Sequence, residues 1–332
     1  MRRRDFITLI GGAATGWPLR GRAQQVAPIP LVGMLMGFGE TDPAAQSLVT
    51  EFTSELTRLG WKSGSNLRIE LRWGAGDTDR IRALAKELVS LQPDAIFGQT
   101  TPVVDALAHE TQKIPIVFVT VSDPVGSGFA KSLTHPGGNI TGFAAYDPAV
   151  GGKWLGLLKE IAPRTVRVAL LFNPATAASP QFFRSSIQDA ASSMAVQLID
   201  APFHAKDEIE AIIAAQARNP GGGLIVMPDA FFFNVTNRDL IIALAARHGV
   251  PAIYWDRLFI VSGGLIAYSA DFAEQLREAA GYIDRILKGA KPADLPIQQP
   301  IKYELAINLK TAKSLGLNIP PTLLATADEA IE

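Results

Sequence analysis

Short apolar runs alternate with amphipathic helical patterns along almost the whole chain. Residues 30–36, 67–73, 95–98 and 114–121 are predicted to form strands, and residues 77–91 carry apolar side chains on one helical stripe. Short, largely apolar strands separated by helices are typical of parallel sheets that helices cover on both faces. The pattern therefore predicts an α/β protein.

The alternation starts again after Gly142 and runs through a second series of similar length. The expected strands in this series are 166–172, 196–200, 223–227 and 251–254. A chain of 332 residues is long enough for two domains, each with its own core. We therefore predict two Rossmann-like lobes with parallel sheets, rather than one large sheet.

The last part of the chain comes too late to build a third domain. It contains an expected strand at 264–268, a helix that begins at the capping box Asp271-x-x-Glu274, and a Pro-rich connection to an expected strand at 303–309. We expect these segments to cross between the lobes as a multi-strand hinge. The first lobe would then comprise residues 29–142 plus 266–292, and the second lobe residues 143–265 plus 293–332.

Residues 1–23 resemble a cleaved export signal. Three arginines follow Met1, a short apolar stretch runs from Phe6 to Leu19, and small residues lie near Ala23. The Arg-Arg-Asp-Phe-Ile run is similar to a twin-arginine signal. The apolar stretch is too short, and too often interrupted by Gly and Pro, to cross a bilayer as a helix. We therefore expect a soluble periplasmic protein after removal of the signal.

Composition excludes several kinds of site and partner. The chain has no cysteine, which rules out disulfides, thiolate metal sites and a cysteine nucleophile. Its formal net charge of -1 shows no basic excess for binding nucleic acid. The four histidines lack metal-ligand spacing, and the sequence contains neither a G-x-S-x-G elbow nor a phosphate-binding loop. We therefore expect a protein that is not an enzyme and uses no cofactor or metal.

Candidate ligand contacts follow from the expected sheets, because open parallel sheets bind ligands at the carboxyl ends of their strands. In the first lobe these positions hold Thr100 and Thr101, at the start of a helix, and Ser122 and Asp123. Hydroxyl groups at a helix N-terminus suit a carboxylate, and Asp123 suits an amine. Two alternatives stay open: a threonine caps its own helix, or Asp123 closes an Asx turn.

The second lobe offers Asn173, Asp229, Phe231 and Tyr254 at the corresponding strand ends, and Tyr268 lies near the expected hinge. Phe231 begins a run of three phenylalanines beside an exposed loop. One or two of these rings would form the wall of a ligand pocket, while the others would fill the core. An amino acid is therefore the predicted ligand, and an aromatic amino acid is the narrower hypothesis.

Several motifs together carry a resemblance to a known family. They are R-R-D-F-I-T-L-I-G-G-A-A at 3–14, S-D-P-V-G-S-G-F-A at 122–130, H-P-G-G-N-I-T-G at 135–142, A-A-R-H-G-V-P-A-I-Y at 245–254 and K-Y-E-L-A-I-N-L-K-T-A-K at 302–313. The chain resembles the exported ABC-transporter substrate-binding proteins of the type I periplasmic-binding fold. Within that family it is similar to the branch that includes tryptophan- and tyrosine-type binders.

The resemblance implies a bilobed fold with a hinge, a ligand cleft between the lobes, and a membrane permease and an ATPase as partners. It does not identify the solute. We therefore predict the solute-binding component of an ABC importer, a monomer that closes around a small molecule. The alternative is an exported sensory module of the same fold, which would feed a receptor or a sensor kinase.

Overall fold

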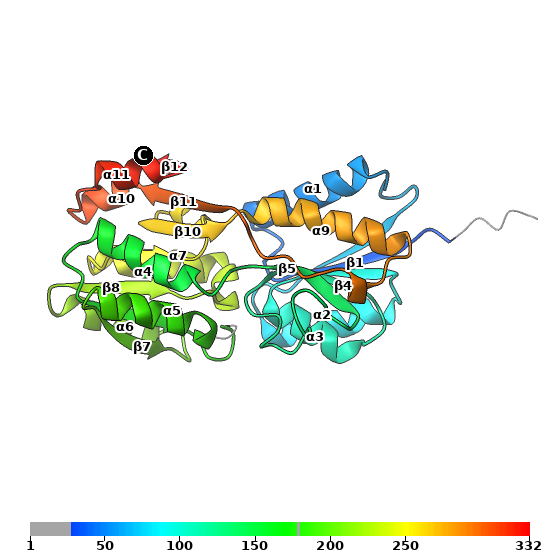
Figure 1. Cartoon of the computed structure of the whole chain (residues 1–332), viewed down its shortest axis with the longest axis horizontal. Helices are drawn as coiled ribbons and strands as arrows, with labels where there is room; N and C mark the ends of the chain where they lie inside the picture. Colours follow the sequence, from blue (N-terminus) through cyan, green and yellow to red (C-terminus); the bar gives the residue numbers. More distant parts are fainter. Residues whose placement is uncertain (1–27, 178–179) are drawn as a thin grey trace, which may run out of the picture.

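The computed structural model describes residues 28–177 and 180–332, and it shows two α/β lobes side by side (Figure 1). Each lobe is built around one sheet with helices on its faces, which confirms the predicted fold class. The expected export signal, residues 1–23, lies outside the described residues. Within the described ranges, no helix combines the length and the apolar character that a membrane crossing needs.

The first lobe contains a five-stranded sheet in the order β2-β1-β3-β4-β5, and each neighbouring pair is parallel. Helices α2 and α3 pack against one face of the sheet, and α1 and α9 cover the other. The bounds are β1 Leu31–Met36, α1 Pro43–Arg58, β2 Arg68–Trp73, α2 Thr78–Ser90, β3 Ala95–Gln99, α3 Thr101–Glu110, β4 Ile116–Val121, β5 Ile140–Ala144, α9 Phe272–Leu287 and the short 3-10 helix η2 Pro292–Asp294. Strands β1, β3 and β5 are buried along their whole length because helices cover both faces.

The second lobe contains a seven-stranded sheet in the order β12-β11-β10-β9-β8-β6-β7. Its neighbouring strands are parallel except for the antiparallel pair β10 and β11. The bounds of the helices are α4 Val150–Ile161, α5 Pro180–Ser193, α6 Glu208–Ala217, η1 Ala230–Phe233, α7 Val235–Arg247, α8 Leu258–Val261, α10 Leu309–Ser314 and α11 Pro321–Thr326. The bounds of the strands are β6 Arg167–Phe172, β7 Gln197–Pro202, β8 Gly222–Val226, β9 Ala252–Tyr254, β10 Ile266–Ala270, β11 Tyr303–Asn308 and β12 Glu329–Ile331.

In the described part of the chain, three segments cross between the lobes: one after β5, one after β10 and one before β11 (Figure 1). The third segment is hydrogen-bonded to the end of β5, where the first segment begins, since the Ala144 N–H donates to the Gln298 carbonyl (2.8 Å). The side chain of Gln275 on α9 also donates to the Ala144 carbonyl (2.9 Å). The crossing segments therefore form a connected hinge, as the sequence predicted.

The expected lobe boundaries are wrong at two points. Strand β10 was expected in the first lobe, but it pairs with β9 and β11 of the second sheet. The chain returns to the first lobe only after this strand, because Asp271 accepts the N–H of Glu274 and begins α9 there. The Pro-rich segment was expected in the second lobe, but it stays on the first, where the Thr141 hydroxyl donates to the Leu295 carbonyl (2.6 Å).

Candidate functional site

A cavity of about 20 Å³ lies between the carboxyl ends of the two sheets. Hydroxyl-bearing side chains after β3 and β4 form one wall, and loops after β6, β8 and β9 form the other. The cavity is lined by Thr100, Thr101, Thr120, Ser122, Tyr146, Thr176, Pro228, Asp229, Ala230, Phe233 and Trp255. This is the place where open parallel sheets bind ligands, and here two sheets share it.

A wider recess of about 300 Å³ adjoins this cavity and shares Thr101 and Thr176 with it. Its other lining residues come from α2, α3 and the loops at 127–129 and 175–177. We call the cavity and the recess together the interlobe cleft. A groove of about 530 Å³ also lies at the opposite edge of the second sheet, at the amino ends of its strands. Parallel sheets rarely use that edge for ligands, so the interlobe cleft is the candidate site.

The start of α3 is unusual because Thr100, at its N-cap, adopts a left-handed φ of 87°. The Thr100 side chain does not cap α3, so that alternative is wrong for Thr100, and its buried hydroxyl has no hydrogen-bond partner among the described residues. Thr120, at the end of β4, has a φ of 58°. Such a backbone costs a β-branched residue about 1–3 kcal/mol and is concentrated at functional sites.

The loop after β1 supports this strained turn through Gly37. A Cβ atom at Gly37 would lie 2.7 Å from Cγ2 of Thr100, so only glycine lets the two loops approach this closely. The Gly37 N–H also donates to Oε1 of Gln99, the last residue of β3 (3.2 Å). The position of Thr100 is therefore fixed by its neighbours and not by its own preference.

Asp229 is the carboxylate in the wall of the cavity, and it is only 3% exposed. It accepts three hydrogen bonds from its own lobe: from the Asn173 N–H (2.7 Å), the Phe231 N–H (2.9 Å) and the Thr176 hydroxyl (2.5 Å). Burial raises the pKa of Asp229 to about 6, although the three hydrogen bonds act in the opposite direction. The second lobe thus holds a buried negative group at the cavity without using a cation.

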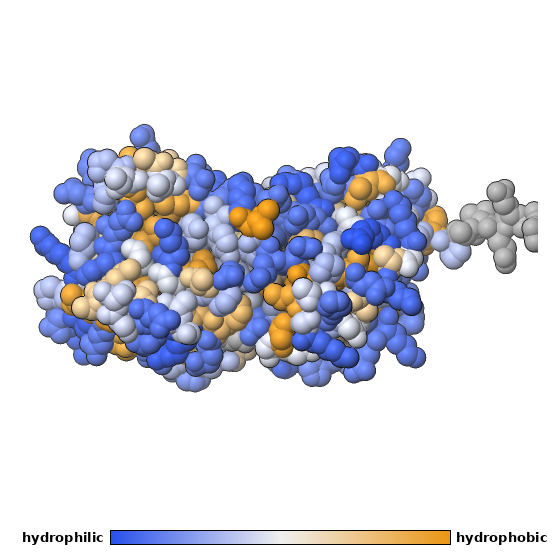
Figure 2. Space-filling view, viewed as in Figure 1, coloured by the Kyte–Doolittle hydropathy of each residue, from blue (hydrophilic) through white to orange (hydrophobic). Residues whose placement is uncertain are grey.

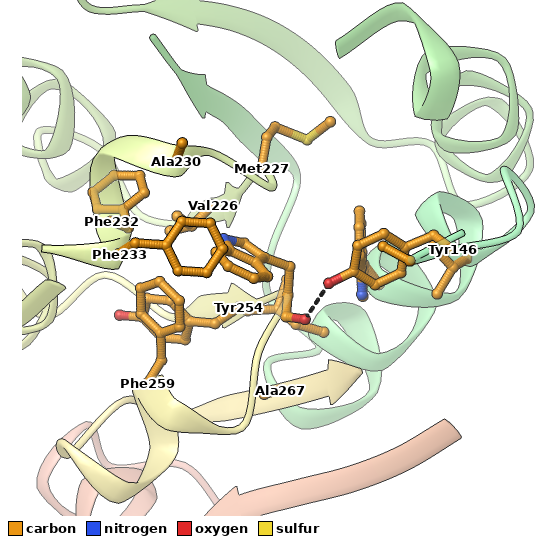
Figure 3. Packing of buried hydrophobic residues seen from close by; sticks show 14 of the residues in the cluster. Tyr146, Val226, Met227, Ala230, Phe232, Phe233, Tyr254, Phe259 and Ala267 are labelled. Carbon is orange, nitrogen blue, oxygen red and sulfur yellow. Dashed lines mark hydrogen bonds between the residues drawn. The ribbon is translucent and has the colours of Figure 1, made fainter. Parts of the chain in front are cut away.

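Aromatic rings complete the cavity. Phe233 packs edge-on against Trp255, with ring centroids 5.4 Å apart. The Tyr146 hydroxyl, on the first crossing segment, donates to the Trp255 carbonyl (2.8 Å; Figure 3). The Trp255 indole N–H is buried and has no partner within the residues that the structure describes. These rings give the cavity a flat, largely apolar wall with one free donor.

The lobes also touch through an ion pair beside the cavity. A guanidinium nitrogen of Arg238, on α7, donates to the Asp42 carboxylate at the start of α1 (3.1 Å), and both side chains are nearly inaccessible. The other Asp42 oxygen caps α1 by accepting the Ala44 N–H. Asp256 is buried nearby, and burial raises its pKa to about 6, an effect that Arg238 reduces and Asp42 increases. The two lobes are therefore closed on each other in this structure.

The cavity brings together only part of the predicted contacts. They are Thr100, Thr101, Ser122 and Asp229. Asp123 lies outside the cavity, because its carboxylate accepts the Gly126 N–H (2.7 Å) in the turn that we named as its alternative. Phe231 is also outside, because its ring packs against Phe203 (5.1 Å), and Phe233 is the ring of that run in the cavity wall.

Three further predicted contacts also lie away from the cavity. The side-chain oxygen of Asn173 is used within its own loop, and its backbone supports the buried carboxylate. Tyr254 stacks on Phe259 with ring centroids 4.7 Å apart, inside the core of the second lobe (Figure 3). Tyr268 stacks on Tyr303 at 5.3 Å, beside the second sheet. None of the three lines the interlobe cleft in this structure.

Sequence reasoning missed several residues that line the cavity. Trp255 is the first residue after β9, and neighbouring residues of an extended chain point in opposite directions. Tyr254 therefore enters the core while Trp255 reaches the cleft. A rule that takes the first residue after each strand would have found Trp255, and also Thr100 and Ser122. Nothing local in the sequence marks Tyr146 or Thr176.

The chemistry of the site is that of binding. Hydroxyls, a helix N-terminus and one buried carboxylate can hold a polar solute, and the rings can enclose its apolar part. Among the described residues, no group of three or more His, Asp or Glu side chains is arranged to hold a metal ion. The side chains gathered here therefore resemble a solute pocket.

Comparison with known proteins finds a relative in sequence and several chains of similar fold. The Tyrosine-binding protein of Clostridioides difficile (strain R20291) is 25% identical over 281 residues, which cover 83% of this chain and 78% of that protein. An ABC domain from Streptococcus pneumonia in complex with L-Trp has a similar fold, with a TM-score of 0.82 and 22% identity over 91% of this chain and 99% of that one. The ligand-free, open structure of a substrate-binding protein from Clostridium difficile has a TM-score of 0.67, with the same identity and coverage.

A family profile covers almost all of the described chain. It matches residues 41–331, from just after β1 to the last strand, and its description is ABC transporter substrate binding protein. The match includes the loops of both lobes that line the interlobe cleft. The chain therefore belongs to the ABC transporter substrate-binding protein family.

Proposed function

We propose that this chain is the solute-binding component of an ABC importer. It would be exported to the periplasm through residues 1–23, capture a solute between its lobes, and deliver it to a membrane permease driven by an ATPase. One observation carries the proposal: the walls of the interlobe cavity come from both lobes. A ligand that contacts both walls favours the closed arrangement over the open one.

The proposed solute is an amino acid, and an aromatic one in particular. The uncapped N-terminus of α3 suits a carboxylate, and Asp229 suits an ammonium group. The rings of Phe233 and Trp255 in the cavity wall suit a flat side chain. The recess of about 300 Å³ that adjoins the cavity offers further room. Two relatives, one named for tyrosine and one crystallised with L-Trp, support this class.

The energetics of closure fit a ligand of this kind. Moving a two-state protein from mostly open to mostly closed takes about 5 kcal/mol of differential affinity. Hydrogen bonds to charged groups contribute about 1.5–3 kcal/mol each. A zwitterion held at its carboxylate by one lobe and at its ammonium by the other therefore supplies enough free energy to close the lobes.

Calorimetry on the mature protein tests the proposal. Residues 24–332 would be unfolded and refolded to remove bound solute, and then titrated with amino acids, sugars and purines. We expect one or a few L-amino acids to bind, aromatic ones most tightly, and the radius of gyration from X-ray scattering to fall on binding. Binding of sugars or purines alone, or conversion of the solute into a product, would contradict the proposal. Uptake of the bound solute by cells with and without the chain then separates transport from sensing.

A further inference from the structure

Two buried polar groups in the interlobe cavity lack hydrogen-bond partners within the described residues. They are the Thr100 hydroxyl, on the first lobe, and the Trp255 indole N–H, on the second. Each residue is only 2% exposed, so water does not replace the missing partner at the protein surface. A buried donor without a partner costs about 1–3 kcal/mol, which makes two such groups in one small cavity a feature that needs an explanation.

Two other indoles among the described residues have an acceptor within the protein. The Trp154 N–H donates to the Tyr268 carbonyl (2.8 Å), and the Trp61 N–H donates to the Asp284 carboxylate (2.8 Å). In both cases the protein itself supplies the acceptor. The Trp255 N–H differs because none of the described residues offers it an acceptor, and Trp255 is one of the residues that line the cavity between the lobes.

We infer that the Trp255 N–H and the Thr100 hydroxyl bind one carboxylate of the solute from opposite lobes. The inference rests on the proposed amino-acid-binding function and adds to it the second-lobe contact to the acid group. An indole N–H only donates, so the ligand atom beside Trp255 is an acceptor. The nearby start of α3, with no side-chain cap, adds positive potential and makes an anionic acceptor the best fit.

The two charged ends of the solute would then contact different residues of the cavity. The carboxylate lies against the donors at Thr100 and Trp255, and the ammonium lies against Asp229. Because one acid group touches both lobes, the bond to Trp255 forms only when the lobes are closed. Trp255 would therefore link recognition of the acid group directly to closure.

The test compares an amino acid with its carboxamide, which has lost the negative charge and one acceptor. The probe is the L-amino acid that wild type binds most tightly in the panel, together with its amide. In Trp255→Phe, which keeps an aromatic ring and removes the N–H, we expect affinity for the acid to fall about 10- to 100-fold. We expect affinity for the amide to change less than about threefold, so that the preference for the acid largely disappears.

Two further variants keep the test independent of the folding of one mutant. Thr100→Val keeps the β-branched shape and removes the hydroxyl, and we expect it to reduce the preference for the acid in the same way. Trp61→Phe removes an indole N–H outside the cavity, one bonded to Asp284, and is the matched control. It should lower stability without changing either affinity. In wild type, the Trp255 indole proton signal in an NMR spectrum should move downfield on adding the acid.

The outcomes separate this inference from the proposed function. If wild type binds an amino acid but both cavity variants keep the wild-type ratio of acid to amide affinity, the inference is wrong and the proposed function stands. If wild type binds only solutes without a carboxylate, the inference and the amino-acid class are both wrong. A loss of the ratio in both variants, with Trp61→Phe unchanged, supports the inference.

Discussion

The two lobes face the same cavity with different chemistry. The first lobe presents uncharged hydroxyls and the start of α3, and holds Thr100 and Thr120 in a left-handed backbone conformation. The second lobe presents one buried carboxylate, Asp229, and two aromatic rings, Phe233 and Trp255. Under the proposed function, each lobe alone would offer the solute only part of its contacts, so that tight binding would need both lobes.

The contact beside the cavity shows a similar asymmetry. On the first lobe, Asp42 is held by its role as the cap of α1. On the second lobe, Arg238 is buried, and one of its nitrogens lacks a partner among the described residues. At this contact the first lobe contributes a side chain held by the backbone, and the second lobe contributes a long side chain. Four substitutions test this comparison, in order of decreasing effect.

Arg238→Met should have the largest effect. It leaves Asp42 and Asp256 buried without the cation that lies between the lobes, and removing one partner of a buried pair costs about 3–5 kcal/mol. Because this cost falls on the closed form, we expect ligand affinity to drop about 100-fold or more. Scattering should show a larger radius of gyration at ligand concentrations that close wild type.

Two controls show whether the ion pair itself is responsible. Adding Asp42→Asn to Arg238→Met removes the orphaned charge and keeps an oxygen to cap α1, so most of the affinity should return. Arg277→Met breaks the exposed pair with Glu51 (3.5 Å), which lies within the first lobe, and should leave affinity unchanged. If the double variant binds as weakly as Arg238→Met, the pair does not control closure.

Asp229→Asn tests the charge that the second lobe contributes. We expect affinity for an amino acid to fall about 10- to 100-fold, because the ammonium loses its counter-charge. In wild type, affinity should also fall below pH 6, by up to about tenfold per pH unit, since burial raises the pKa of Asp229 to about 6. Calorimetry between pH 5 and 8 would show a flat profile for the variant.

The free energy of unfolding should respond to pH in the opposite direction to ligand affinity. The pKa of Asp229 in the folded protein lies above its ordinary value of 3.8, so the folded protein holds the proton more tightly than the unfolded chain does. The contribution of Asp229 to the free energy of unfolding therefore rises as pH falls from about 7 to 4. Asp256 changes the free energy of unfolding with pH in the same direction in wild type and in Asp229→Asn. The difference in free energy of unfolding between the two proteins therefore isolates the contribution of Asp229. A difference that does not change with pH would contradict the shifted pKa.

The sequence predicted the fold more completely than the site, and particular residues show why. Apolar strands and Asx caps are local signals, so helices such as α2, capped by Asp77, and α9, capped by Asp271, were found where they begin. Strand ends also placed Thr100 and Asp229 on the cavity. Tyr254 was predicted to contact the ligand, but its ring stacks on Phe259 in the core. The next residue, Trp255, points the other way and lines the cavity.

The contacts across the cleft were beyond local reasoning. Asp42 caps its own helix, which is a local contact, but its ion-pair partner Arg238 lies 196 residues later. That pairing depends on how the lobes close, and closure depends on a hinge whose crossing points were misplaced at β10. The order of elements follows from the sequence pattern, whereas side chains that meet between lobes follow from the packing of whole domains.

Gly76→Ala tests how closely the lobes approach. Gly76 has a φ of 71°, and a Cβ atom there would lie 2.9 Å from the Ala230 carbonyl on the other lobe. We expect a loss of about 1 kcal/mol in stability from the backbone, and a separate loss of about 3- to 10-fold in affinity because the closed form is crowded. Gly60→Ala, at a φ of 100° with no heavy atom within 4 Å among the described residues, is the control. Gly60→Ala should lower stability and leave affinity unchanged. If both variants lost affinity equally, crowding of the closed form at Gly76 would not be the cause.

Thr100→Gly should change stability only modestly, but the sign of the change is informative. Glycine adopts the left-handed backbone without strain, so relief of about 1–3 kcal/mol outweighs the entropy cost of about 0.5–1 kcal/mol. We therefore expect Tm to rise by about 2–4 °C in thermal unfolding while ligand affinity falls. Thr101→Gly, one residue further in the regular first turn of α3, should lower Tm instead. If both variants lower Tm, the backbone of Thr100 is not strained. The position of the Thr100 hydroxyl in the cavity then carries no cost in stability.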